Sequence, residues 1–288
     1  MLAKYLFIII LLLTANSWAE DNSDLPRWVT VWAGGLPIIL AAPHGGREPI
    51  PGISVRRGQG VAQFATERDS NTAELAEQIS TTLARQMGAP PFLVVARFER
   101  KYVDANRAPG DAYESPKARP YYDAYHRALE ESCNRVRNRW GRGLLLDLHG
   151  QGAEKEIIFR GTANGKSVAE LERRFGREAL TGGKSILGQL VSKGYKVAPD
   201  FASDKELRYT GGFTIRNYGS HRANGIDALQ LELGTTLRDR RNLKRTADDL
   251  AEAIAVFAKR FLSLAPQSEI QSGTMDTHGE IGGNGAME

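Results

Sequence analysis

The stretch LLLDLHGQG, residues 144–152, decides the fold class. Its leucines are typical of a fully buried strand, yet the run ends in Asp147, His149 and Gly150. In open α/β sheets, ligands bind in the crevice beyond the carboxyl ends of the strands. A core strand that stops on a histidine therefore predicts an α/β sheet with a binding site at this edge.

Two other apolar segments end in the same way. PIILAAPHGG, residues 37–46, terminates in His44 and two glycines, and ALQLELG, residues 228–234, carries Glu232 near its end. Glycines at these ends remove side-chain bulk and allow the backbone to turn sharply beside a bound ion or substrate. We expect the two imidazoles and the carboxylate to converge on one rim of the sheet.

Strand and helix patterns alternate along the rest of the chain. The sequence predicts strands over 29–33, 37–42, 91–98, 143–148, 156–159 and 226–233, and helices over 70–87, 119–138, 166–176, 182–193 and 245–263. Such alternation predicts a three-layer α/β/α architecture with a mixed, largely parallel sheet covered on both faces.

The two ends of the chain differ from the middle. Residues 1–19 combine Lys4, the apolar run YLFIIILLL and the small residues of SWA, which is typical of a secretory signal cleaved after Ala19. The alternative is an uncleaved anchor, although the apolar run is shorter than the roughly 20 residues that a membrane span needs. We expect a single domain over 20–265, a disordered tail over 266–288, and a periplasmic or secreted protein without a stable membrane span.

Composition excludes several classes of site and partner. Cys133 is the only cysteine, so an intrachain disulfide and a thiolate metal cluster are both excluded. The formal net charge of +4 is small, and RDRRNLKR at 238–245 is interpreted as a solvated helix face. No nucleic-acid partner is expected, and any metal must be bound by histidines and carboxylates.

Histidine and carboxylate are the ligands that zinc takes in hydrolases, with water in the open position. A single histidine after a strand is more often a hydrogen-bonding residue of a turn than a metal ligand, but His44 and His149 together favour a metal site. Asp147 points to the same side of its strand as His149 and is expected to orient that imidazole. The acid that completes the site stays open among Glu48, Glu67 and Asp69.

Eight segments together resemble the N-formylglutamate amidohydrolase family, relatives of the zinc carboxypeptidase-like hydrolases. They occur in the family's order and are PHGG (43–46), RDSNT (68–72), RKYVDANR (100–107), YYDAYHRAL (121–129), LLLDLHG (144–150), RGTANG (160–165), YTGGFTIRNYG (209–219) and ALQLEL (228–233). The resemblance implies a fold of the zinc-peptidase, phosphorylase/hydrolase-like type.

The resemblance also implies the roles of individual residues. His44, Asp69 and His149 would bind Zn²⁺, Glu232 would act as general base or acid, and Arg107 would act in catalysis and, with Arg100, clamp a substrate carboxylate. The implied substrate contacts are Arg100, Asn106, Arg107, Gly211, Gly212 and Arg216, with residues 209–219 forming a polar strand or loop at the pocket wall.

The implied activity is zinc-dependent hydrolysis of the C–N amide bond of a small or short peptide-like substrate that bears a carboxylate. A secreted zinc peptidase or a cell-wall amidase would use the same site. A solute-binding protein without catalysis is the alternative from a different class, and the presence of Glu232 beside two histidines argues against it.

The signal segment generates a direct prediction. Cleavage after Ala19 gives a mature chain that begins at Glu20, which N-terminal sequencing of the protein from the extracytoplasmic fraction would detect. Recovery of the chain with Met1 intact from that fraction would show that the segment is not a cleaved signal.

Overall fold

The computed structural model describes residues 25–200 and 205–267. The expected signal segment, the cleavage point at Ala19 and residues 268–288 of the expected tail lie outside these ranges. Within them, no helix has both the length and the apolar character needed to cross a membrane.

A seven-stranded sheet forms the centre of the molecule. Its spatial order is β1 (Val29–Trp32), β3 (Phe92–Ala96), β2 (Ile38–Ala42), β4 (Leu144–Gln151), β7 (Asp227–Gly234), β5 (Ile157–Gly161) and β6 (Lys196–Ala198). Strands β3, β2, β4 and β7 are mutually parallel, whereas β1 is antiparallel to β3 and β5 is antiparallel to β7. The predicted mixed, largely parallel sheet is confirmed.

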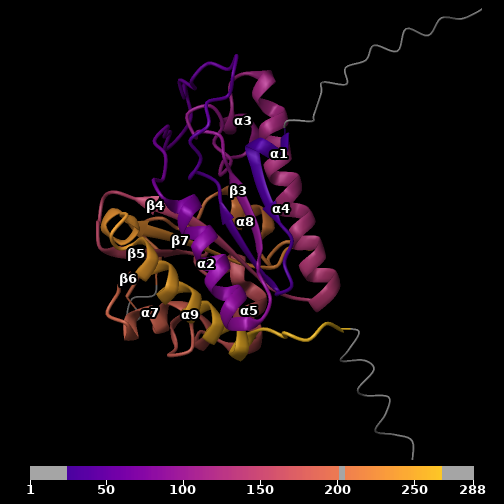
Figure 1. The fold of residues 1–288 in the computed structure, drawn as a ribbon, viewed down its shortest axis with the longest axis vertical. Coiled ribbons are helices and arrows are strands. Elements are labelled where there is room, and N and C mark those ends of the chain that lie inside the picture. Colours follow the sequence, from indigo (N-terminus) through magenta and orange to yellow (C-terminus); the bar gives the residue numbers. More distant parts are fainter. Residues whose placement is uncertain (1–24, 201–204, 268–288) are drawn as a thin grey trace, which may run out of the picture.

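Helices cover both faces of the sheet (Figure 1). One face packs against α2 (Thr72–Met87), α5 (Ala169–Phe175), α6 (Glu178–Thr181), α7 (Ile186–Ser192) and α9 (Leu243–Phe261), and the other against α1 (Leu25–Trp28), α4 (Arg119–Trp140) and α8 (Phe213–Tyr218). The two hydrophobic cores on either side of the sheet confirm the three-layer architecture.

The leucine run of β4 shows how the sequence divides between these cores. Leu144, Leu146 and Leu148 belong to the core under α2 and α9, whereas Leu145 belongs to the core under α4. Because side chains alternate across a strand, Asp147 and His149 lie on the same face as Leu145. Burial of the leucines thus fixes the direction of the two polar side chains.

Glycines end the two longest helices that precede central strands. Gly88 after α2 has φ 76° and Gly141 after α4 has φ 73°, and each donates its N–H to a carbonyl of the last helical turn. This left-handed conformation is the common C-terminal stop of helices and suits glycine because it has no Cβ.

Three local predictions were wrong. Residues 213–218, expected as strand or loop, form helix α8, which is only 6 residues long and too short for a helical period to stand out. Residues 196–198 form the unpredicted strand β6, whose 3 residues are half-buried or exposed. In the expected solvated helix at 238–245, Arg238 is buried at the end of a 3-10 turn, and α9 begins only at Leu243.

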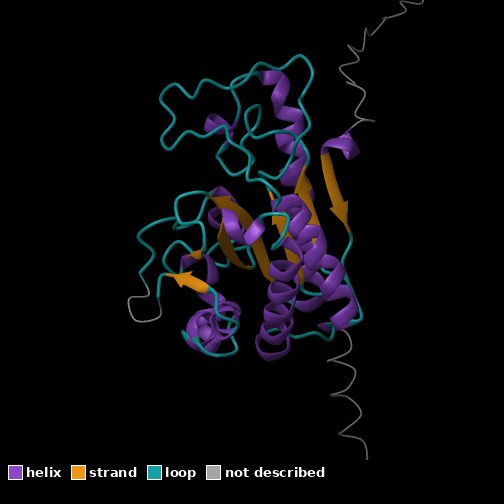
Figure 2. Ribbon diagram, turned by 60° about the vertical axis from the view of Figure 1, so that its left-hand side comes forward, coloured by secondary structure: helices purple, strands orange, loops and turns teal. Residues whose placement is uncertain are grey.

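Long segments gather beyond one end of the sheet, on the side where the central parallel strands end (Figure 2). They follow β2 and β3 over residues 43–71 and 97–118, where the regular elements are α3 (Pro109–Ala112) and a 3-10 turn at Pro116–Ala118. A further 3-10 turn, Lys166–Val168, precedes α5, and Thr235–Arg238 follows β7. Residues of 43–71, 97–118 and Thr235–Arg238 line the cavity described next.

Candidate metal centre and surrounding cavity

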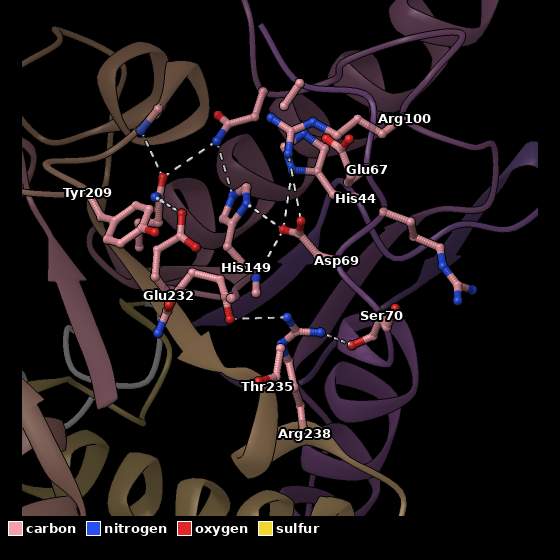
Figure 3. Close-up of a pocket in the computed structure, with 18 of the residues that line it drawn as sticks. His44, Glu67, Asp69, Ser70, Arg100, His149, Tyr209, Glu232, Thr235 and Arg238 are labelled. Carbon is pink, nitrogen blue, oxygen red and sulfur yellow. Dashed lines mark hydrogen bonds and ion pairs between the residues drawn. The ribbon is translucent and has the colours of Figure 1, made fainter. Parts of the chain in front are cut away.

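Two histidines and one aspartate from three separate segments converge at the carboxyl ends of the central strands (Figure 3). His44 follows β2, His149 lies near the end of β4, and Asp69 precedes α2. One ligand atom from each residue lies within 4.8 Å of the others. Asp69 Oδ2 lies 3.4 Å from His44 Nδ1 and 3.2 Å from His149 Nδ1.

A buried carboxylate contacts the Nε2 atom of each imidazole, on the side of the ring away from Asp69. His44 Nε2 lies 2.7 Å from Asp104 Oδ1, and His149 Nε2 lies 2.9 Å from Asp147 Oδ2. An ionised carboxylate only accepts hydrogen bonds, so each Nε2 donates to its carboxylate and each Nδ1 faces Asp69. This carboxylate–histidine arrangement is common around protein-bound metals because it fixes the tautomer and the ring orientation.

The arrangement fits a divalent metal ion. His44 Nδ1 is buried and makes no hydrogen bond among the described residues. A buried polar atom without a partner is costly, and two imidazole nitrogens with a carboxylate oxygen form a ligand set that zinc accepts. His44, Asp69 and His149 can therefore hold a metal.

Asp69 is the acid that the structure brings to the two histidines. Glu67 lines the same cavity but is outside the three-residue group. Glu48 lies away from the cavity, where its carboxylate is 3.8 Å from Arg27. The path of the chain between β2 and α2 determines which of the three acids reaches the histidines. The spacing of the acids along the sequence does not reveal this path.

Hydrogen bonds keep Asp69 ionised. Burial by itself would raise the pKa of Asp69, but the hydrogen bond from His149 and the neighbouring imidazole of His44 outweigh burial and hold that pKa well below its usual range. The N–H of Gly150 also donates to Asp69 Oδ2 at 3.0 Å. The carboxylate is therefore a charged acceptor, as metal binding requires.

Asp104 supports the candidate metal centre through His44, and the sequence did not predict this contact although Asp104 lies inside the segment 100–107. In addition to His44, its carboxylate accepts hydrogen bonds from Arg100 Nε at 3.0 Å and from the N–H of Asn106 at 3.1 Å. Burial would raise the pKa of Asp104, but the charges of His44 and Arg100 and the His44 hydrogen bond lower it well below its usual range.

Glu232 lies next to His149, because the two residues are directly paired across β4 and β7. Gln230 Nε2 donates to Glu232 Oε1 at 2.9 Å, and Gln230 Oε1 accepts the N–H of Gly212 at 2.8 Å. Burial raises the pKa of Glu232, the charge of Asp69 raises it further, and the histidines partly oppose this shift. A buried carboxyl group with a raised pKa beside a candidate metal centre is a candidate proton carrier.

These groups open into a cavity of about 990 Å³. Of the expected substrate contacts, it is lined by Arg100, Asn106, Arg107, Gly211 and Gly212. Arg107 donates to the carbonyl of Gln63 at 3.0 Å, whereas Arg100 is engaged by Asp104 and lies 3.7 Å from Asp69.

Arg216 is the expected substrate contact that the structure places elsewhere. It is exposed on α8, and its guanidinium bonds to Gly211 O at 3.0 Å and Thr210 Oγ1 at 3.1 Å rather than lining the cavity. The helical turn of α8, in place of the expected strand or loop, directs this side chain away.

Arg238 lines the cavity instead, and it joins three segments of the rim. Its guanidinium donates to the carbonyls of Leu233, Ser70 and Gln151, at the ends of β7, of the loop before α2 and of β4. A Cβ on Gly150 would lie 2.4 Å from the guanidinium carbon, so a larger residue after His149 would displace the Arg238 side chain. In the sequence, Arg238 appeared only as the first residue of the charged run at 238–245, which did not predict its place at the cavity.

Comparisons with known proteins support the fold. No protein-family model matches the sequence, and no curated protein matches it significantly. N-formylglutamate amidohydrolase from Ralstonia eutropha is similar in structure, with a TM-score of 0.56 and 19% identity over 81% of this chain and 98% of that chain. A gene product from Agrobacterium tumefaciens gives 0.54 and 15% over 81% and 95%. The resemblance seen in the sequence is thereby confirmed at the level of the fold.

The contact between Asp104 and His44 generates a prediction. Asp104→Asn should weaken binding of added Zn²⁺ by about 10–100-fold, because His44 loses the charged acceptor that fixes its tautomer. Competition with a chromophoric chelator measures this affinity. Asp111→Asn, in the nearby helix α3 and exposed, is the control and should bind as the wild type does. Equal affinity in the two variants would remove Asp104 from the metal centre.

Proposed function

We propose that this protein is a zinc-dependent amidohydrolase that cleaves the C–N amide bond of a small substrate bearing a carboxylate. One observation carries the proposal: His44 Nδ1, buried without a hydrogen bond, and His149 Nδ1 both face Asp69 beside the buried carboxyl group of Glu232. The fold shared with an N-formylglutamate amidohydrolase is consistent with it.

The three protein ligands would leave a coordination position open, as in catalytic zinc sites. When bound there, zinc polarises a substrate carbonyl and lowers the pKa of water. Asp104 and Asp147 would accept the hydrogen bonds of the two Nε2 atoms and so leave each Nδ1 to coordinate the metal.

Glu232 would move the proton. Its Oε1 accepts from Gln230, which leaves Oε2 to take a proton from the attacking water and deliver it to the leaving amine nitrogen. The raised pKa suits both steps, because a carboxyl group with a very low pKa would be a poor acid in the second one.

Arg107 would bind the substrate carboxylate. Its half-buried guanidinium faces the cavity with a backbone carbonyl as partner, and a guanidinium bonds a carboxylate with two parallel hydrogen bonds. Arg100 is held by Asp104, so we assign it to the support of the metal centre rather than to the main substrate clamp.

The cavity volume favours a second candidate within the same chemistry. At about 990 Å³ it is at the upper end of the range for small-molecule sites, and a formylated amino acid would fill only part of it. A short peptide or a cell-wall peptide, attacked at an amide bond by the same groups, would fill more. Export guided by residues 1–19 is consistent with such a substrate.

Metal analysis and a substrate screen test the proposal. The purified protein should contain one equivalent of zinc and hydrolyse N-formyl or N-acyl amino acids, short peptides or cell-wall peptides. A chelator should abolish this activity and added Zn²⁺ should restore it. A zinc-loaded protein that binds such compounds but hydrolyses none of them would be a solute-binding protein instead.

Glu232→Gln should keep the shape of the site but lose the proton carrier. We expect kcat to fall by about 10²–10⁴-fold while the zinc content stays that of the wild type. Glu48→Gln, outside the cavity, is the matched control and should retain wild-type turnover. Near-normal turnover of Glu232→Gln would identify another residue as the base.

Arg107→Ala should act mainly on KM, because it removes a contact with the bound substrate and leaves the proposed proton carrier in place. The loss should shrink for a substrate whose carboxylate is amidated, and Arg216→Ala, which removes an arginine outside the cavity, should have little effect. If kcat of Arg107→Ala falls by the same factor on the charged and on the amidated substrate, Arg107 contacts the reacting atoms rather than the carboxylate.

A further inference from the structure

One wall of the cavity is formed by a backbone segment in an unusual conformation. Tyr209 has φ 54°, in the left-handed region that a bulky aromatic residue rarely adopts, and lines the cavity together with Thr210, Gly211 and Gly212. Such strain persists only where the surrounding structure enforces it, and it concentrates at functional sites.

Glu206 anchors the segment three residues before Tyr209. Its buried carboxylate accepts hydrogen bonds from Arg160 Nε at 3.0 Å, from the N–H groups of Thr162 and Asn164 at 2.8 and 2.9 Å, and from the Thr162 hydroxyl. The N–H of Glu206 in turn donates to Asn164 Oδ1 at 2.9 Å. A carboxylate with this many donors is firmly fixed in position.

Backbone contacts also hold the segment at Tyr209 itself and at the residue that follows it. The N–H of Ala163 donates to the carbonyl of Thr210 at 2.7 Å. A Cβ on Gly161 would lie 2.5 Å from the carbonyl oxygen of Tyr209, so the glycine allows the two backbones to approach closely. The end of β5 and the loop after it thus determine the position of Tyr209.

This position brings the phenol ring beside Glu232. The ring of Tyr209 packs against that of Phe159 with centroids 5.0 Å apart, and Phe159 is paired directly with Glu232 across β5 and β7. Directly paired residues of antiparallel strands project to the same face of the sheet. Figure 3 shows Tyr209 next to Glu232, on the side of that carboxyl group away from Ser70.

We propose that Tyr209 is a further catalytic residue, whose hydroxyl donates a hydrogen bond to the scissile carbonyl oxygen as that oxygen gains negative charge. The inference rests on the proposed amidohydrolase function and adds a group to it. The phenol keeps its proton throughout, and Glu232 carries the proton that is transferred. Preorganised donors aimed at a developing oxyanion are a large source of rate enhancement.

The environment of the phenol supports a donor role. Burial raises the pKa of Tyr209, the nearby Arg208 opposes this shift, and the charges of Glu232 and Asp69 raise the pKa further. The hydroxyl group is therefore protonated at neutral pH. Glu206 belongs neither to the cavity lining nor to the candidate metal ligands, and we assign it as the positioning residue for Tyr209.

Tyr209→Phe tests the proposal because it removes one oxygen and keeps the ring against Phe159. We expect kcat to fall by about 100-fold, with KM and zinc content little changed. Tyr102→Phe, at a similarly half-buried tyrosine outside the cavity, is the matched control and should retain wild-type kcat. A wild-type kcat in Tyr209→Phe would overturn the proposal.

A binding measurement makes the test independent of turnover. Acetohydroxamate presents a carbonyl-type oxygen to the zinc-loaded site, and its Kd should rise by about tenfold or more in Tyr209→Phe but not in Tyr102→Phe. If the wild type hydrolyses no amide, the proposed function fails, while this comparison still decides whether Tyr209 donates to an oxygen in the site. An unchanged Kd in Tyr209→Phe would contradict the proposal.

A double-mutant cycle tests the role of Glu206. Glu206→Gln replaces an acceptor oxygen by an amide group facing N–H donors, so Tyr209 should lose its position and kcat should fall. Added to Tyr209→Phe, the same change should lower kcat no further, because the hydroxyl it positions is already absent. Fully additive losses would show that Glu206 does not act through Tyr209.

Discussion

The parallel pairing of β2, β4 and β7 is the constraint on which the rest of the structure depends. Because these strands run in one direction, their carboxyl ends meet at one edge, where His44, His149 and Glu232 are found. The register is fixed by burial on both faces of β4, and a slip of one residue would turn Asp147 and His149 into the apolar core under α2 and α9. The site therefore follows from the packing of leucines as much as from its own polar contacts.

Electrostatics then determine what the converged groups do. Asp69, Asp104 and Asp147 are all buried, and a buried carboxylate is stable only when it is paired and hydrogen-bonded. The two imidazoles and Arg100 supply those partners, and the supporting pairs Asp104–His44 and Asp147–His149 leave both Nδ1 atoms facing a common point. Glu232 lacks an arginine partner in direct contact among the described residues, so burial dominates and raises its pKa. Asp69 and Asp104 thus stay charged, as the proposed metal binding requires, and the raised pKa of Glu232 suits the proposed proton transfer.

The sequence predicted those features that depend on local pattern. The long strands and helices were correct because their apolar periods extend over many residues, and His44 and His149 were recognised because they interrupt buried runs. Long-range contacts were not readable in this way: Asp104 meets His44 across 60 positions, and Arg238 reaches Ser70 across 168. Short elements such as α8 carry too few residues for a period, and the left-handed backbone at Tyr209 leaves no signal in its residue type.

The central claim is that His44 and His149 bind one zinc ion through their Nδ1 atoms, with Asp69, while Asp104 and Asp147 hold the Nε2 atoms. A crystal of the zinc-loaded protein, with data on both sides of the zinc absorption edge, tests it most directly. The account predicts one anomalous peak roughly 2.0–2.1 Å from both Nδ1 atoms and at coordination distance from Asp69. A peak at the Nε2 atoms, or zinc bound without one of these three residues, would contradict it.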